Sequence, residues 1–416
     1  MSQVRSFCWV AYAWIAISIV GPTGAEDLSV QRALDLAIVN NPSIAAGDLS
    51  ADAATHAARG ARALSNPELV VAPTALGEAG ADSAVLFSQP LEINGSRQAR
   101  SDIATHRAAA ARHDANALRR GVALQVRQAY WDLAQAQELV RLNQQNLEHL
   151  RAIRDAVQKQ LDAGAVPGVQ VTKADVELAR ARQEVAVAEL AVSQARAVLN
   201  VLMGRPAGAA LTASDPLVFE PVSPDRDRLV AAAANRPEIA AARAQVAAAR
   251  GEIRAAKLRR TPDLAVQARR ETFDSGSDSG VAVAITLPLL DWGSAKAARK
   301  QAEAEAASRE KQFQAVTNQL EGEVERAIAR MEASASVVRE YEAGILTRSE
   351  ELAAAARKGY EKGATGYLEV LEAQRTLLSV KTRYTEALAE HARALAQLEW
   401  ASGVPLSGPE ATEVTR

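Results

Sequence analysis

Cysteine is almost absent from this chain of 416 residues, since Cys8 is the only one and lies in an apolar N-terminal stretch. That stretch has the features of a secretory signal: a positive charge at Arg5, an apolar run over 7–20 and small residues ending at Ala25. Removal of residues 1–25 leaves no disulfide, no thiolate nucleophile and no cysteine metal ligand. An uncleaved anchor helix is the alternative, although the run is short for a membrane span.

Aromatic side chains are scarce as well, at 4% of the chain, whereas the 48% hydrophobic share consists largely of alanine. A wide globular core needs large side chains to fill it, while helices packed at close distance need small ones. The formal charge of -2 gives no basic surface of the kind that nucleic acids require. The composition therefore predicts long, thin helical walls and no nucleic-acid partner.

Residues that carry chemistry are few and scattered. No two of the five histidines have the i, i+4 spacing of a chelating pair, and they are His56, His106, His113, His149 and His391. The acidic segment 274–280 lacks the terminal glutamate of a calcium loop and is interpreted as a surface loop. We expect no enzyme activity, no cofactor and no metal site.

What the sequence does contain is an internal repeat. Four residues recur 195 positions later, with Pro42, Ile44, Pro67 and Leu69 returning as Pro237, Ile239, Pro262 and Leu264. Four more recur 199 positions later, with Gly164, Leu178, Gly204 and Pro206 returning as Gly363, Leu377, Gly403 and Pro405. The pattern predicts two copies of one unit, 26–206 and 226–406, with a linker at 207–225 and a flexible tail at 407–416.

Each unit is predicted to contain a helix, two short strands and a long helical hairpin, which makes the fold mainly α with a small β part. In the first unit we expect a helix over 29–64 interrupted near Pro42, strands at 69–74 and 84–90, and helices at 96–160 and 169–203. In the second we expect a helix over 227–260, strands at 264–272 and 281–289, and helices at 294–362 and 367–402.

The predicted hairpins carry heptad repeats, which indicate a left-handed antiparallel coiled coil in each. In the first hairpin the seven-residue series are Val171, Leu178, Val185, Val192 and Leu199, interleaved with Ala174, Ala181, Ala188, Ala195 and Leu202. The partner helix has Val126, Leu133, Val140, Leu147 and Leu161, with the series broken by Arg154. The second hairpin has Val324, Met331, Val338, Ile345 and Leu352. His391 falls on an a position and is predicted to be a core residue.

The predicted strands alternate between apolar and polar residues, as in Leu264, Val266 and Ala268 against Gln267, Arg269 and Glu271. This alternation is typical of a membrane barrel with a polar interior, and a half-buried sheet against a helix is the alternative. Four strands cannot close, because small barrels need about eight. Two chains would supply eight strands and three would supply twelve, and a trimer is favoured if the long helices line a passage.

Both hairpin turns carry glycines, which reverse the chain and leave exposed tips. The predicted docking points at these tips are Gly164, Ala165, Gly168, Val169, Gly363, Ala364, Gly366 and Tyr367. Just past the second turn, Glu369 and Glu372 share a helix face. In a symmetric assembly they would form rings of negative charge that select cations, and a merely solvated helix face is the alternative.

Two segments, together with the repeat, carry a family resemblance. Phe-Ser-Gln-Pro-Leu-Glu-Ile-Asn-Gly-Ser-Arg at 87–97 and Lys-Gly-Ala-Thr-Gly-Tyr-Leu-Glu-Val-Leu-Glu-Ala-Gln at 362–374 resemble the outer-membrane efflux proteins, the TolC-like channel-tunnels. The resemblance implies a homotrimer with a twelve-stranded barrel in the outer membrane and a coiled-coil tunnel across the periplasm. It also implies a passive exit duct, docked to a periplasmic adaptor and an inner-membrane pump, for heavy-metal cations or drugs.

The resemblance assigns positions in the gate as well. It places Glu369 and Glu372 at acidic constriction rings and Tyr360 at a gating tyrosine. Thr365 and Gln170 stand where the best-known member has an arginine and its aspartate partner, so that gate is not carried over unchanged. Segment 88–95 is most similar to the cation-efflux branch, whose pumps are of the resistance-nodulation-division type. A periplasmic adaptor or scaffold is the alternative function, and it would be expected to carry one hairpin rather than two.

Overall fold

A computed structural model describes residues 26–73, 83–273, 276–288 and 290–406. The first half contains α1 (Val30–Asn40), α2 (Pro42–Ala61), β2 (Glu68–Pro73), β3 (Ser83–Leu91), α3 (Ser96–Asp162) and α4 (Val169–Leu202). The second half contains α5 (Arg226–Ala233), α6 (Pro237–Leu258), β5 (Asp263–Phe273), β6 (Gly276–Thr286), α7 (Ser294–Glu340), a π-helical turn η1 (Tyr341–Ile345), α8 (Leu346–Glu361) and α9 (Tyr367–Ser402). The mainly helical fold is as predicted, and the predicted signal peptide and tail lie outside the described residues.

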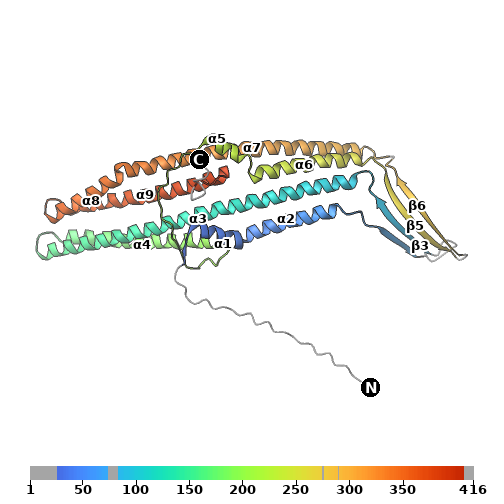
Figure 1. Ribbon diagram of the computed structural model, residues 1–416. Helices are drawn as coiled ribbons and strands as arrows, with labels where there is room; N and C mark the ends of the chain where they lie inside the picture. Colours follow the sequence, from blue (N-terminus) through green and yellow to red (C-terminus); the bar gives the residue numbers. More distant parts are fainter. Residues whose placement is uncertain (1–25, 74–82, 274–275, 289, 407–416) are drawn as a thin grey trace, which may run out of the picture.

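The molecule is a long layer of helices with a sheet at one end and two hairpin tips at the other (Figure 1). On the tip side the helices lie in the order α4, α3, α9 and α8, and on the sheet side in the order α2, α3, α6 and α7. Helix α3 belongs to both halves, because its 67 residues span roughly 100 Å. The layer is therefore one helix thick along most of its length.

The seam of the first hairpin follows the predicted heptads. Val171, Leu178 and Leu199 are buried, and so are the interleaved alanines at 174, 181 and 188. Val185 and Val192 are partly buried against neighbouring clusters. Small alanine side chains at alternate seam positions let α3 and α4 approach closely, which is why this composition favours a thin wall.

The second hairpin departs from its predicted heptads, because the helix predicted over 294–362 is interrupted by the π-helical turn η1. Val338 is fully buried, but Ile345 and Leu352 are 38% and 51% exposed. The next buried positions are Ser349, eleven residues after Val338, and Ala356, seven residues after Ser349. A π-helical turn inserts an extra residue, so the seven-residue count fails there while the seam itself continues.

The helix predicted over 227–260 is also wrong in its continuity, since α5 and α6 are separate. Pro237 occupies the first turn of α6, as Pro42 does in α2, and it holds the preceding Arg236 in an extended conformation. The Arg236 side chain is only 1% exposed; it lies 2.7 Å from Glu238 and 3.2 Å from Glu323. Its guanidinium stacks on Trp400 at 4.3 Å. These contacts fix the bend between the two helices.

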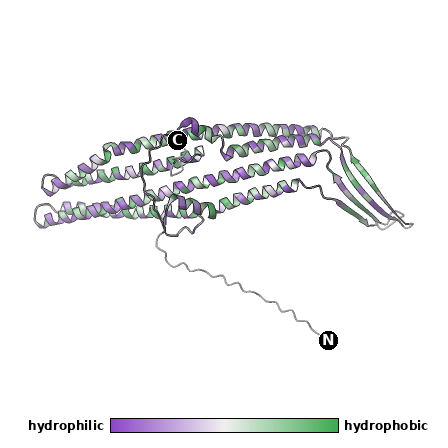
Figure 2. Ribbon diagram, in the orientation of Figure 1, coloured by the Kyte–Doolittle hydropathy of each residue, from purple (hydrophilic) through white to green (hydrophobic). Residues whose placement is uncertain are grey.

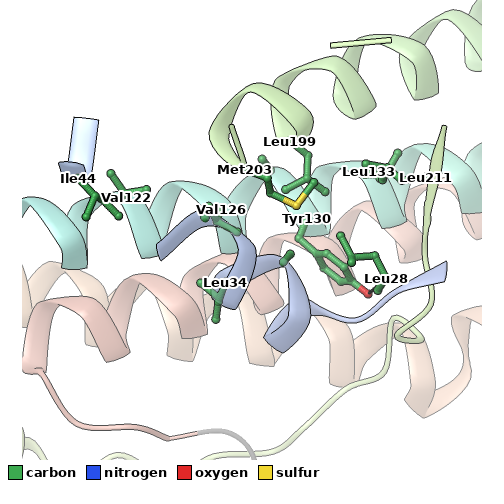
Figure 3. Packing of buried hydrophobic residues seen from close by; sticks show 13 residues of the cluster. Leu28, Leu34, Ile44, Val122, Val126, Tyr130, Leu133, Leu199, Met203 and Leu211 are labelled. Carbon is green, nitrogen blue, oxygen red and sulfur yellow. Dashed lines mark hydrogen bonds between the residues drawn. The ribbon is translucent and has the colours of Figure 1, made fainter. Parts of the chain in front are cut away.

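The linker takes part in a small sheet that the sequence did not indicate. Strand β1 (Glu26–Leu28) pairs in parallel with β4 (Leu211–Ala213). Tyr130 on α3 donates its hydroxyl hydrogen to Leu28 O at 2.8 Å and accepts from Asp215 N at 2.9 Å. Figure 3 shows Tyr130 beside Leu28, and Leu211 belongs to the same buried cluster. One buried tyrosine on α3 thus forms hydrogen bonds with both the start of the described chain and the linker.

His391 on α9, in the second hairpin, also contacts the linker. It is 2% exposed, in agreement with the predicted core position. Its Nε2 atom lies 3.1 Å from Glu220 O in the linker, and its Nδ1 atom lies 3.1 Å from Ser334 Oγ on α7. The linker is therefore held against both hairpins.

The four strands at the end of the layer form one antiparallel sheet in the order β2, β3, β5, β6. The prediction of a loop at 274–280 is wrong from Gly276 onward, because β6 begins at that residue. In the pairing of β5 with β6, Phe273 lies opposite Gly276 and Glu271 lies opposite Asp278. Continued pairing satisfies the backbone groups of 276–280 better than an open loop does. Residues 274–275 lie outside the described part of the chain.

The Tyr130 hydroxyl allows a test of the linker contact. Tyr130→Phe leaves Leu28 O and Asp215 N without this partner, and we expect the free energy of unfolding to fall by about 1–3 kcal/mol. Thermal unfolding of the detergent-solubilised protein measures the change. Tyr341→Phe is the control, because the Tyr341 hydroxyl makes no hydrogen bond with a described residue. Equal stability of the two variants contradicts the prediction.

Candidate functional site

One face of the sheet is mainly apolar across all four strands, with Gln89 on β3 and Arg270 on β5 as polar exceptions. The register places on this face Leu69, Val71, Val85, Phe87, Leu264, Val266, Ala268, Val281, Val283 and Ile285. We call these ten residues the apolar sheet face. Within it, Val71 is 60% exposed and Val281 is 79% exposed. No helix covers the sheet, which extends beyond the end of the helical layer (Figures 1 and 2).

The opposite face is mostly polar or small, with Val70, Leu86 and Phe273 as its large apolar residues. It carries Ser88, Gln267, Arg269, Glu271 and Asp278 between alanines. Gln267 donates to Ser88 Oγ at 3.5 Å, and Arg269 pairs with Glu271 at 3.4 Å. A sheet with one apolar face and one polar face can separate lipid from water, while the edges at β2 and β6 remain open in the single chain.

The two hairpin tips have the same turn geometry. Gly164 and Gly363 adopt φ of +74° and +72°, a conformation that favours glycine. Ala165 N donates to Gln160 O at 2.8 Å, and Ala364 N donates to Gly359 O at the same distance. The predicted docking residues other than Tyr367 are exposed, namely Gly164, Ala165, Gly168, Val169, Gly363, Ala364 and Gly366. Both tips lie at the end opposite the sheet (Figure 1).

Tyr367 differs from the other predicted docking residues, because it is only 4% exposed. It packs with Leu371 against residues of the first hairpin, namely Leu147, Leu150, Val157, Val171, Ala174 and Leu178. Burial raises the pKa of its hydroxyl, and the negative charge of Glu177 adds to the effect. The ring of Tyr367 thus fills the space between the hairpins in the single chain, and docking at this residue stays a prediction.

Tyr360 bridges the two hairpins near the tips. Its hydroxyl donates to Gln160 Oε1 on α3 at 2.7 Å, and burial raises the pKa of this hydroxyl. Gln160 was not among the predicted gate residues, whereas Gln170 lies in the first turn of α4. A second bridge joins Arg375 on α9 to Glu177 on α4 at 2.5 Å. The only sequence signal for Gln160 is that it stands, like Tyr360, in the last helical turn before a tip glycine.

Thr365 closes its own turn. Its hydroxyl donates to Ala356 O at 3.0 Å, and its backbone N–H donates to Gly359 O at 3.3 Å. A Cβ atom on Gly359 would lie 2.7 Å from Thr365 Cγ2, so the methyl group needs a glycine opposite it. The Thr365 side chain thus makes local contacts within the tip.

Glu369 and Glu372 are both exposed on α9. Glu369 Oε2 accepts from Gly366 N at 3.2 Å and so caps the start of α9. Glu372 makes no side-chain hydrogen bond or ion pair with a described residue. The exposed stripe continues along α9 as Thr376, Ser379 and Arg383. Within the described residues, no group of three histidine, cysteine or acidic side chains is placed to hold a metal ion.

Helix α4 has a second apolar face besides its seam with α3. Val187, Leu190, Val198 and Val201 are between 55% and 61% exposed. Among the described residues, α4 is the one helix whose length and composition would allow it to cross a membrane. Its seam is packed on α3, so the exposed residues form a separate surface at the edge of the helical layer.

Sequence comparison relates the chain to a known family and to a curated protein. The family model for outer membrane efflux proteins matches residues 33–205 and 229–404. The chain is 28% identical over 371 residues to the cobalt-zinc-cadmium resistance protein CzcC of Cupriavidus metallidurans, covering 88% of each chain. The two matched segments correspond to the two halves of the helical layer.

Solved structures share the fold along nearly the whole length. The chain resembles CusC with a TM-score of 0.77 at 20% identity, covering 93% of this chain and 96% of that one. It resembles the CmeC outer membrane channel of Campylobacter jejuni with a TM-score of 0.78 at 16% identity, covering 100% and 97%. The chain belongs to the outer membrane efflux protein family.

Proposed function

We propose that three copies of this chain form a passive exit duct through the outer membrane. The observation that carries the proposal is the four-stranded sheet, with its apolar face and its two open edges at β2 and β6. Unpaired strand edges cannot face lipid, so copies of the chain must supply the missing partners. Three copies give a twelve-stranded barrel with room for an aqueous lumen, whereas two give an eight-stranded barrel filled by its own side chains.

The helical layer supports the same assembly. It ends at α4 on one side and at α7 and α8 on the other, and the exposed apolar face of α4 lies along the first of these edges. Joining the edges of three copies covers this face and closes the layer into a tunnel. Because each copy contributes two similar hairpins from its duplicated unit, the wall becomes nearly sixfold symmetric.

The cargo is inferred from charge and from similarity. CzcC is named for resistance to cobalt, zinc and cadmium, and heavy-metal cations are the substrate class that we propose here. Three copies of Glu369 and of Glu372 would place two rings of negative charge around the tunnel axis, which favours cations. The cations are cargo that passes through, driven by an inner-membrane pump of the resistance-nodulation-division type. The exposed tips are the proposed docking points for a periplasmic adaptor.

The contacts between the hairpins are the proposed gate. Tyr360 with Gln160 and Arg375 with Glu177 hold the second tip against the first. Loss of these two contacts frees α8 and α9 to move outward and widen the opening. Thr365 keeps its own turn rigid, and Gln170 is proposed to contact a neighbouring copy. A scaffold function is less suitable, because an adaptor would be expected to carry one hairpin and no four-stranded apolar sheet.

The first prediction concerns the oligomer. We expect the detergent-solubilised complex to have three times the mass of the mature chain. Val187→Glu with Leu190→Glu buries charges in the proposed contact and is expected to shift the complex to monomers. Mass measurement by light scattering tests this, with Val218→Glu in the exposed linker as the control. A wild-type protein that remains monomeric at high concentration contradicts the proposal.

The acid rings are tested by ion selectivity. Glu369→Gln with Glu372→Gln removes six negative charges from the proposed trimer, and the preference for cations is expected to fall several-fold. Reversal potentials of single channels under a salt gradient measure the change. Glu321→Gln removes an exposed acid of α7 outside the stripe and serves as the control. An unchanged reversal potential in the double variant excludes the rings as the source of selectivity.

The gate is tested by weakening both contacts together. Tyr360→Phe with Arg375→Gln removes roughly 2 kcal/mol from the closed arrangement, which is about thirtyfold in the ratio of open to closed. We expect a higher open probability in single-channel recordings. Arg180→Gln is a matched control, because Arg180 also pairs with Glu177 but lies on the same helix. Equal open probabilities in the two variants refute the assignment of the gate.

A further inference from the structure

Trp292 lies in the connection between β6 and α7 and is 92% exposed. No other large hydrophobic side chain in the described residues is as exposed. The connection lies at the end of the sheet that joins the helical layer (Figure 1). A tryptophan left almost entirely in solvent by its own chain requires an explanation outside that chain.

The backbone at Trp292 adds an independent observation. Its φ is +46°, and it is the only described residue other than glycine with a positive φ. Asp291 O accepts from Ser294 N at 2.7 Å, so Trp292 and Gly293 are the central residues of a tight turn. Such turns favour Asn-Gly, and Asn94-Gly95 stands at the matching place in the first half of the chain. The tryptophan thus occupies a strained position that an asparagine would suit better.

Other connections at the same end of the sheet also expose apolar side chains. Leu64 between α2 and β2 is 58% exposed, and Ile93 between β3 and α3 is 69% exposed. Leu290 between β6 and α7 is 76% exposed. Together with Trp292 we call these residues the junction belt. The belt is continuous with the apolar sheet face, because Val283 and Ile285 of β6 immediately precede its connection to α7.

Basic side chains lie next to the junction belt. Lys257, Arg259, Lys296 and Lys300 are exposed and form no ion pair with a described residue. Three nearby acids are already paired, since Glu92 pairs with Arg100, Asp291 with Arg260 and Glu303 with Arg299. Asp263 at the start of β5 accepts a hydrogen bond from Asn94 and makes no ion pair with a described residue. Glu68 lies on the polar face of the sheet. Four positive charges per chain are therefore available beside an apolar belt.

We propose that the junction belt lies in the headgroup layer of the periplasmic leaflet, and that the four basic side chains bind the phosphates of anionic phospholipids there. The indole suits this layer, because its ring is apolar and its N–H can donate to headgroup oxygens. Free cations beside the layer attract anionic lipid. The inference rests on the proposed barrel, and it assigns the residues that fix the depth of the sheet in the membrane.

Depth-dependent quenching of tryptophan fluorescence tests the belt. Without residues 1–25, the tryptophans are Trp131, Trp292 and Trp400, and the first and last lie in the helical layer. The assembled complex is placed in vesicles whose lipids carry bromine near the headgroup or deep in the acyl chain. We expect strong quenching by the shallow bromine, weak quenching by the deep one, and loss of both in Trp292→Phe.

Trp292→Asn separates anchoring from folding. Because asparagine tolerates the left-handed conformation, we expect the melting temperature of this variant in detergent to be unchanged or higher, while the shallow quenching is lost. A lower melting temperature in detergent means that Trp292 serves a contact within the protein or between copies, and it overturns the proposal. Quenching that is the same for wild type and Trp292→Phe also overturns it.

The basic side chains are tested with phosphatidylglycerol added to detergent micelles. We expect phosphatidylglycerol to raise the melting temperature of the wild-type complex. We expect the apparent affinity for phosphatidylglycerol to fall at least several-fold in a variant with Gln at Lys257, Arg259, Lys296 and Lys300. Replacement of Lys358 and Lys362 by Gln at the distant tip is the control. Equal responses in the two variants refute the lipid site.

These outcomes are distinguishable from failure of the duct. A wild-type complex that conducts in single-channel recordings but shows no quenching at Trp292 overturns the anchor alone. A wild-type complex that neither assembles nor conducts overturns the duct as well.

Discussion

The close contact of α3 with the helices on both sides of it is the interaction on which the rest of the structure depends. Helix α3 packs against α2, α4, α6 and α9, and its buried positions near the sheet are alanines. Small side chains bring the helices together but leave no wide core to fill. The buried residues accordingly form separate clusters along the molecule rather than one centre. A thin wall of this kind has two surfaces and two edges, which is the shape that a duct needs.

A single chain leaves much of this wall without a partner. The apolar sheet face, the strand edges and the second face of α4 are all exposed in one copy. Exposed apolar surface of this extent marks a surface for binding lipid or protein. In the proposed trimer, stability, assembly and transport are linked, because the surfaces that complete the fold are the same ones that would close the passage. The junction belt adds a fixed depth in the bilayer to this scheme.

Local patterns predicted local elements well. The bounds of α3, α4 and α9 lie within two residues of the predicted helices, because heptads and tip glycines mark them directly. The failures occur where the pattern has an exception. The π-helical turn shifts the seam from Ile345 and Leu352 to Ser349 and Ala356, and Pro237 divides a helix that its alanine-rich composition made look continuous. In the contact between the hairpin tips, Tyr360 was singled out from the sequence and its partner Gln160 was not.

The sequence by itself determined the order of elements, the apolar seams and the alternation of the strands, because each of these depends on residues a few positions apart. Only the tertiary structure decided which distant residues meet. Gln160 and Tyr360 are 200 positions apart, and Glu177 and Arg375 are 198 positions apart. Their contact depends on how the two hairpins lie side by side, which no spacing within either hairpin encodes. The strain at Trp292 also became visible only in the structure, since backbone conformation is set by the turn around it.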